Sequence, residues 1–472
     1  MPTPLPPLSG VDPTTFLFTG GAIVTGSPVL GDLDSGDVLV HDGVILAVGR
    51  HVRDAPEFAD RLADAVVVDT RGRIVAPGFV DTHRHAWQSQ LRRSITDVGD
   101  LGSYLTSTLG RAAPAYTPED MLIGTRLAAL AALDAGITTM LDFSHNARSA
   151  AHTDAAVAGL VDTGIRGVHA SMAPHFGDWD GQWPADLARV VSRYQGAARG
   201  RLTVGLAALA TEEIAGDRLA YGPRLASVAE SLDIGVSVDA VFGATSSHAV
   251  LDWSRRGILH SRVMLIHATG LTDEAWRAAG DAGATVALAP TSEPLIGLES
   301  GVPAIDEALA VGIRPGLSVD VEVALAGDMF TQMRTLLAVQ RMRAVERAPD
   351  RTAPAARITT RDVLDFATLH GAHTLGLADR TGSIEPGKRA DVILVNAESV
   401  ATMPLNDAVG TLVLGASPAD VEAVLVDGVP RKWAGSLVGV DVDALRVEVT
   451  ESRDAILRRI GQGVDQRRRA GR

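Results

Sequence analysis

Short hydrophobic segments alternate with longer helical segments through most of this 472-residue chain. From residue 74 onward, eight short apolar runs rich in β-branched residues each precede helical or loop sequence. They begin at Ile74, Gly136, Gly167, Leu202, Gly235, Val263, Ala284 and Gly316. Regular alternation of this kind predicts parallel strands joined by crossover helices. Eight such units within about 250 residues predict a closed (β/α)8 barrel of the TIM type.

A doubly wound open sheet is the alternative architecture for the same alternation. Its usual sequence signal is a glycine-rich phosphate-binding turn directly after a strand. None of the eight predicted strands is followed by such a turn. The pattern therefore favours the barrel.

The two ends of the chain have a different pattern. Residues 14–80 contain short apolar or alternating runs, cut by glycine-containing turns, and β character returns near residue 380. We predict an α/β protein in which residues 1–70 and 381–472 form a small β-sandwich domain. Residues 71–380 then form the catalytic barrel, and a closing helix runs from about Asp441 to Ile460.

Composition narrows the classes of partner. The net charge of −14 argues against a nucleic-acid or anionic-membrane partner. No apolar run approaches the length of a membrane span, and no signal peptide is visible, so we expect a cytoplasmic protein with a small-molecule substrate. The absence of cysteine excludes disulfides, thiolate metal sites and cysteine nucleophiles. Barrels of this type commonly pair, which predicts a homodimer.

Candidate chemistry lies where the predicted strands end, because these ends face the active site of a parallel barrel. The first strand ends in His83 and His85, which point the same way on an extended chain and can share one divalent ion. The sixth strand ends at His267 and the eighth at Asp320. Imidazoles with a carboxylate suit Zn²⁺ or Fe²⁺, so we expect one such ion here.

Several separated motifs resemble the amidohydrolase superfamily, in the branch of cytosine deaminase, the methylthioadenosine and S-adenosylhomocysteine deaminases, and the triazine hydrolases. The motifs span residues 77–85, 266–271, 317–320 and 384–391. The last of these resembles the segment where the family's chain rejoins the β-sandwich. The resemblance extends from about residue 15 to residue 435.

The resemblance implies a mononuclear hydrolase of a C–N bond in a heterocyclic or cyclic amidine substrate. In that family, one ion is held by two histidines of strand 1, a histidine of strand 5 and an aspartate of strand 8. The ion activates water, and the aspartate shuttles the proton during attack on an sp² carbon. The matching residues here are His83, His85, Asp320 and, beside the ion, the strand-6 residue His267.

Two departures from the family pattern matter. The chain has no lysine before Lys388, which excludes a binuclear site bridged by a carboxylated lysine. The branch also carries His-x-x-Glu at the end of strand 5, where our alignment places Ser237 and Ala240.

Three interpretations of this strand remain open. In the first, Asp239 replaces the ligand or the proton shuttle. In the second, His248 folds back from the following loop. In the third, the barrel binds metal weakly or not at all and catalyses a non-hydrolytic step, as a lyase, isomerase or cyclase acting on a specialised metabolite. A non-catalytic binding protein is a further alternative.

Residues near the strand ends are candidates for substrate contacts, with a purely structural role as the alternative for each. Trp87 and Gln88 follow the histidine pair closely. The complete set of predicted substrate-binding residues is Trp87, Gln88, His145, Ser237, His248 and Glu293. Asp320, His267 and Asp239 are the predicted acid–base groups.

Overall fold

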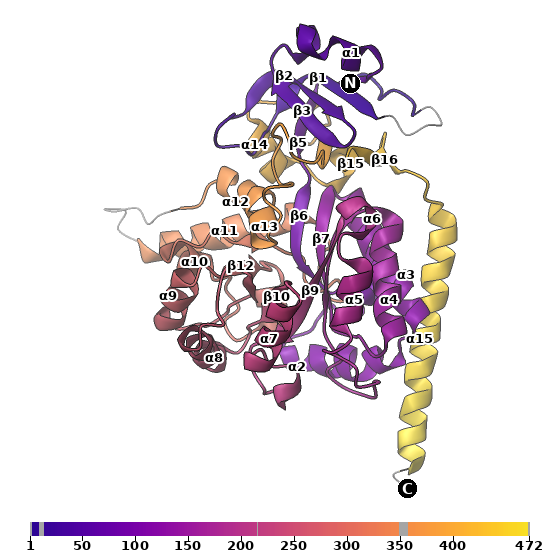
Figure 1. Ribbon diagram of the computed structural model, residues 1–472, viewed down its shortest axis with the longest axis vertical. Helices are drawn as coiled ribbons and strands as arrows, with labels where there is room; N and C mark the ends of the chain where they lie inside the picture. Colours follow the sequence, from indigo (N-terminus) through magenta and orange to yellow (C-terminus); the bar gives the residue numbers. More distant parts are fainter. Residues whose placement is uncertain (1, 9–13, 215, 349–356, 471–472) are drawn as a thin grey trace.

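The computed structural model describes residues 2–8, 14–214, 216–348 and 357–470, with side chains up to residue 462. Two sheets organise the described chain, one of eight strands and one of nine. In Figure 1 the small domain, which contains the nine-stranded sheet, lies at one end of the helix-covered barrel formed by the eight-stranded sheet. No helix in the described ranges is long and apolar enough to cross a membrane.

The eight-stranded sheet is a barrel of parallel strands in sequential order. Its strands are β6 (Phe79–Arg84), β7 (Ile137–Ser144), β8 (Arg166–Ser171), β9 (Leu202–Leu209), β10 (Gly235–Asp239), β11 (Val263–Ile266), β12 (Thr285–Leu288) and β13 (Gly316–Leu317). Closure comes from the backbone of Asp320, whose N–H donates to the His83 carbonyl at 2.9 Å. The His85 N–H in turn donates to the Asp320 carbonyl at 3.0 Å. The predicted (β/α)8 barrel is therefore confirmed.

Helices surround this barrel and bury their apolar faces against it. The longer ones are α3 (Pro118–Asp134), α4 (Ala150–Thr163), α5 (Leu187–Tyr194), α7 (Pro223–Ser231), α8 (Gly243–Arg255), α9 (Asp273–Asp281) and α11 (Met329–Arg347). Helix α3 begins with a capping box in which Thr117 and Asp120 satisfy each other's backbone N–H groups. Pro118 occupies the first helical position, where its missing N–H has no consequence.

The nine-stranded sheet is built from both ends of the chain. It contains β1 (Thr15–Ile23), β2 (Leu33–His41), β3 (Val44–Gly49), β4 (Val66–Asp69), β5 (Arg73–Pro77), β14 (Val392–Asn396), β15 (Val421–Val426), β16 (Val429–Trp433) and β17 (Ser436–Leu437). The rings of Phe16 and Trp433 lie 5.8 Å apart although their strands, β1 and β16, are not neighbours in the sheet. The sheet therefore curls. A small β domain made from both ends is thus confirmed, while its boundaries at residues 70 and 381 stay predictions.

One predicted strand is wrong in detail. The apolar run from Ile74 to Val80 is two strands, β5 in the nine-stranded sheet and β6 in the barrel. The chain changes sheets at Gly78, where a Cβ would approach the Thr138 side chain to 2.2 Å. Only glycine permits this close passage, so the first barrel strand begins at Phe79.

The chain ends in α15 (Val442–Ala470), which begins where the closing helix was predicted and extends further. It runs along one side of the barrel, and its end lies far from the small sheet domain (Figure 1). Ser452 donates to Asp120 at 2.7 Å and accepts from Gln90 at 3.1 Å. Helix α15 therefore braces the segment η3 (Ala86–Leu91), which directly follows His85.

Candidate metal centre and active site

Three side chains that can bind a metal converge at the C-terminal end of the barrel. His83 Nε2 and His85 Nε2 lie 3.1 and 3.2 Å from the same oxygen, Asp320 Oδ1. One donor atom from each residue lies within 4.8 Å of the other two, and all three residues are buried. Two imidazoles and a carboxylate form a donor set suited to Zn²⁺ or Fe²⁺.

The surroundings orient the two imidazoles for this role. His85 Nδ1 lies 3.1 Å from the Phe143 carbonyl, to which it can donate when Nε2 binds an ion, and Nε2 faces Asp320. The Phe143 ring packs edge-on against both histidine rings at 5.1 and 5.3 Å. A backbone carbonyl behind a ligating histidine is a common second partner, because it fixes the tautomer and the ring plane. The residues present therefore fit a divalent ion.

The backbone is strained at the same place. His267 and Asp320 have φ values of +62° and +65°. This left-handed region costs a residue other than glycine about 1–3 kcal/mol and persists only where the surrounding structure imposes it. For Asp320 the imposing contacts are the two backbone hydrogen bonds that close the barrel. The closure of the barrel and the placement of the carboxylate thus depend on one residue.

His267 is held next to Asp320 by a buried glutamate. Its Nδ1 lies 3.2 Å from Glu293 Oε1, and its Nε2 lies 3.7 Å from Asp320 Oδ2. Burial alone would lower the pKa of His267. The hydrogen bond with Glu293 and the charges of Asp320 and Asp239 instead raise this pKa to about 9. The surrounding carboxylates therefore favour the imidazolium form of His267.

The protonation states of the other two groups suit metal binding. Burial is the largest influence on His83 and lowers its pKa to about 3 despite the nearby Asp320. Burial would raise the pKa of Asp320, but hydrogen bonds from His83 and His85 and the charge of His267 hold it well below its usual value. A neutral imidazole thus faces an ionised carboxylate.

Strand β10 brings Asp239 to this cluster. Asp239 ends the strand and pairs in register with Ile266, the residue before His267. Its Oδ1 is buried and has no hydrogen-bond partner among the described residues. Burial raises the pKa of Asp239, and its charge interacts with those of His267, Asp320 and His85. A carboxylate therefore occupies the strand end where the family pattern has histidine.

Two other expectations for strand 5 need correction. Ser237 lies two residues before Asp239 and lines a cavity at the opposite, N-terminal end of the strands. Ser237 is therefore not at the level of the site, and a short apolar strand offers no internal mark of which inward-facing residue is. His248 does not fold back, since it lies on an exposed face of α8.

Comparison with known proteins now decides the family. The model of the amidohydrolase family matches residues 74–431. The chain belongs to the amidohydrolase family. The match includes every barrel strand and His83, His85, His267 and Asp320, so the prediction of an amidohydrolase-type enzyme is confirmed at this level.

Relatives of this amidohydrolase extend over most of both chains. A 5-methylthioadenosine/S-adenosylhomocysteine deaminase from Symbiobacterium thermophilum is 29% identical over 419 residues, covering 86% of this chain and 92% of the relative. A 5'-deoxyadenosine deaminase from Methanosarcina mazei is 26% identical over 426 residues, covering 88% and 91%.

Two solved structures share the fold. An adenosine deaminase from Xanthomonas campestris with bound zinc has a TM-score of 0.78 and 23% identity, covering 94% of this chain and 99% of its own. A mutant atrazine chlorohydrolase from Arthrobacter aurescens, complexed with zinc and atraton, has a TM-score of 0.78 and 22% identity, covering 93% and 100%.

The remaining candidates in this amidohydrolase form a buried polar layer beside the histidine pair. Trp87 Nε1 lies 3.3 Å from His145 Nδ1, and the rings of His145 and His85 lie 4.1 Å apart. Burial lowers the pKa of His145 well below its usual value, so this ring is neutral. His175 packs next to it at 5.1 Å, and its Nδ1 has no partner in the described chain.

The sequence pattern missed Tyr104. This residue ends the short helix α2 (Leu101–Tyr104), and its hydroxyl accepts a hydrogen bond from Gln88 Nε2 at 2.7 Å. Tyr104 is buried and close enough to Asp320 and Asp239 for their charges to help burial raise its pKa. It does not lie at a strand end, so the rule that located the other residues could not find it.

An apolar layer covers the site. A separate cluster of buried side chains lies on the segments that follow the strand ends, and it contains Trp87, Leu91, Tyr104, Leu109, Val241, Ile296, Val321 and Val323. The side chains of His83, His85, His267 and Asp320 consequently expose between 0% and 7% of their surface. Reaction at this cluster would proceed away from bulk water.

Proposed function

We propose that this amidohydrolase is a mononuclear, divalent-metal-dependent deaminase of an amino-substituted heterocycle. The observation that carries the proposal is the convergence of two imidazole nitrogens on one carboxylate oxygen, His83 and His85 on Asp320. The relatives are named for adenine-containing substrates, which makes an exocyclic amino group on a purine the first chemistry to test.

His83, His85 and Asp320 would hold the ion, and Asp239 would supply the strand-5 carboxylate. The unpartnered Oδ1 of Asp239 supports this role, because a buried carboxylate oxygen without a partner is costly unless it binds a cation or substrate. When bound, a divalent ion at this place lowers the pKa of a water molecule to near neutrality. Zinc or iron is the metal that we expect.

Asp320 is suited to move the proton. Its carboxylate is ionised and lies against both proposed ligands, where it would take a proton from the attacking water. It then delivers that proton to the nitrogen that leaves as ammonia. His267, held as an imidazolium by Glu293, places positive charge beside Asp320 and would stabilise negative charge developing on the substrate.

The polar layer next to the histidine pair would orient the substrate. Trp87, Gln88 and His145 form this layer with Tyr104, whose hydroxyl accepts from Gln88 and keeps its own proton available for donation. Such pre-placed donors hold a heterocycle in one plane and reduce the entropy lost on reaching the transition state.

The test is a pair of measurements on protein purified without chelators. We expect close to one equivalent of zinc or iron per chain, and release of ammonia from at least one of adenosine, 5'-deoxyadenosine and methylthioadenosine. The variant Asp320→Asn should keep the fold and lose ammonia release. Less than roughly a tenth of an equivalent of metal, with activity retained in chelator, would contradict the proposal. Substrate consumption without ammonia release would indicate a lyase or isomerase instead.

We also propose that the protein is a homodimer, the common state of barrels of this type. Light scattering of the purified protein at micromolar concentration distinguishes the dimer from a 49.3 kDa monomer.

A further inference from the structure

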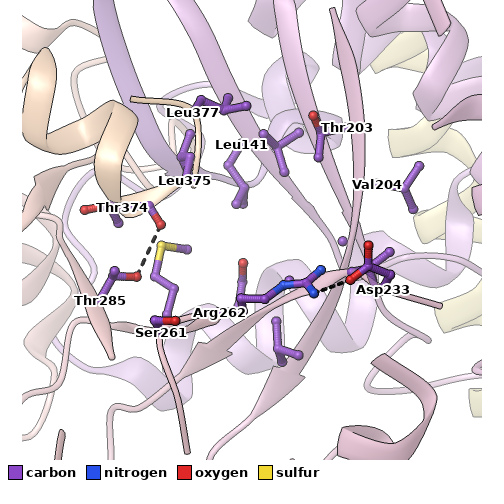
Figure 2. A pocket seen from close by; sticks show the side chains of 18 of the residues that line it. Leu141, Thr203, Val204, Asp233, Ser261, Arg262, Thr285, Thr374, Leu375 and Leu377 are labelled. Atoms are coloured by element: carbon purple, nitrogen blue, oxygen red, sulfur yellow. Dashed lines mark hydrogen bonds and ion pairs between the residues drawn. The ribbon is translucent and has the colours of Figure 1, made fainter. Parts of the chain in front are cut away.

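A cavity of about 210 Å³ lies at the N-terminal ends of the barrel strands, opposite the metal centre. Figure 2 shows the side chains that line it. We call it the N-terminal cavity. Its walls come from β7 to β12 and from the end of α13 (Leu369–Thr374). Barrel interiors of this type are normally filled by layers of large side chains. A cavity within one therefore needs a physical explanation.

The explanation lies in two strand glycines. The registers of β9, β10 and β11 place Gly205 beside Gly235, and Ser237 beside Met264. Alternation along β10 puts Gly235 and Ser237 on the same face as Asp239, the inside of the barrel. Gly205 and Gly235 thus leave two adjacent inward-facing positions, near the N-terminal ends of β9 and β10, without a side chain.

Neither glycine is required by the backbone. Neither has a positive φ, so a residue with a side chain could adopt the same conformation. A Cβ at Gly205 would be 3.4 Å from the nearest atom and one at Gly235 would be 3.6 Å from it, both ordinary contacts. Glycine within a strand destabilises the fold relative to alanine. These two positions therefore keep the cavity open at the expense of stability.

The cavity wall carries both apolar and hydrogen-bonding groups. Leu141 and Leu377 line it on one side (Figure 2). Met264 also lines the cavity. Thr374 also lines it, and its Oγ1 is buried without a hydrogen-bond partner among the described residues, although its backbone carbonyl accepts from Thr285 at 3.2 Å. A buried hydroxyl without a partner favours an occupant that can form a hydrogen bond.

The charged groups of the cavity neutralise each other. Asp233 and Arg262 form an ion pair at 2.5 Å on the side opposite the Thr285–Thr374 contact (Figure 2), at the rim of the cavity, where the Asp233 side chain is 92% exposed. No net charge is left to attract an anion or a cation. We propose that the N-terminal cavity is a second binding site, separate from the metal centre, for a small uncharged molecule that is largely apolar and carries one hydrogen-bonding group.

The experiment uses the full-length protein labelled with ¹³C at the methionine methyl groups, and indole as the uncharged probe. The nine methionines give few resonances, and a Met264→Leu spectrum assigns the one in the cavity. We expect the Met264 resonance to shift saturably with indole and not with benzoate or benzylammonium. Absence of a saturable shift with indole, or an equal shift with the charged probes, would overturn the proposal.

Two variants tie the response to the cavity. The double variant Gly205→Ala/Gly235→Ala reduces its volume and should weaken indole binding at least fivefold, whereas Gly49→Ala, another strand glycine with room for a Cβ, should leave binding unchanged. Thr374→Val should weaken indole binding about as much while leaving the binding of toluene, which has no donor, unaltered. Equal indole affinity in all of these variants would show that the probe binds elsewhere.

Discussion

The two ends of the barrel are built by opposite means. At the C-terminal end, His83, His85, His267 and Asp320 are packed against each other and covered by apolar side chains. At the N-terminal end, glycines leave a cavity whose charged groups are already paired. The backbone is strained at the C-terminal end, at His267 and Asp320. At the N-terminal end the strands are unstrained but contain Gly205 and Gly235.

This difference shows that departures from the most stable choice occur at both ends of the same strands. A left-handed aspartate and an unpartnered carboxylate are expensive, and they occur where we propose catalysis. Strand glycines with room for a side chain are also unfavourable, and they occur where we propose binding. The contrast between the ends can be tested by changing each of them separately.

The largest effect should come from removing the histidine pair. His83→Ala with His85→Ala deletes two ligands, so metal content should fall close to zero and turnover by at least roughly 10³-fold. Metal analysis and an ammonia assay measure the two effects, and circular dichroism checks the fold. His248→Ala, on the exposed face of α8, should change neither quantity. Retained turnover in the double variant would show that His83 and His85 do not hold a metal that the reaction needs.

Breaking the ion network behind the histidines should cost the most stability. Arg84, between the two ligands in sequence, is completely buried and contacts Asp81 at 2.7 Å and Glu322 at 3.5 Å. Arg84→Met leaves two buried carboxylates without this partner, which should cost about 3–5 kcal/mol of unfolding free energy. Urea denaturation measures it. Arg71→Met, in an exposed pair, should change stability by less than about 1 kcal/mol.

A variant of Asp239 distinguishes a strand 5 that supplies a ligand or proton shuttle from one that contributes nothing to the site. Asp239→Asn keeps the shape and removes the charge, so we expect metal affinity or turnover to fall about 10- to 100-fold. Competition with a chromogenic chelator gives the affinity. Asp252→Asn on exposed α8 is the matched control. Unchanged affinity and unchanged rate in Asp239→Asn would mean that strand 5 contributes nothing to the site.

Substitution of the two glycines at the N-terminal end should raise the stability of the protein, whereas the Arg84 variant lowers it. Gly205→Ala and Gly235→Ala should each stabilise the protein by about 0.5–1 kcal/mol, because alanine loses less backbone entropy on folding. The melting temperature reports this gain, with metal content unchanged. A loss of stability would mean that the cavity does not have room for the two methyl groups.

The smallest effect concerns pH at the N-terminal end. Burial raises the pKa of Asp365, in α12 (Thr360–Phe366), to about 6, although the charge of Arg361 opposes the shift. Because the folded state binds this proton more tightly than the unfolded state, the group lowers stability as pH rises from about 4 to about 6. Above pH 6, Asp365→Asn should therefore have a higher melting temperature than the parent. The gain in unfolding free energy should be less than about 1 kcal/mol after solvent screening. At pH 4 the two should melt together.

Part of the site was predictable because its positions follow from strand periodicity. His83, His85, His267 and Asp320 end strands whose apolar runs are visible in the sequence, and a parallel barrel brings such ends together. Ser237 was misplaced because nothing in Gly235–Asp239 marks which inward-facing residue lies at the level of the site. Tyr104 and the role of Glu293 depend on how connecting segments fold over the barrel, which periodicity does not describe.

The sequence by itself determined the barrel, the small β domain from both chain ends, and the histidine pair with its aspartate. These follow from local alternation and from residue types at strand ends, which are properties of a few neighbouring residues. Only the tertiary structure decided that Gly78 passes the chain between two sheets, that Asp239 meets the histidines, and that Gly205 and Gly235 border a cavity. Those facts depend on register and close approach between segments far apart in the chain, because contact across a barrel is set by the closure of all its strands.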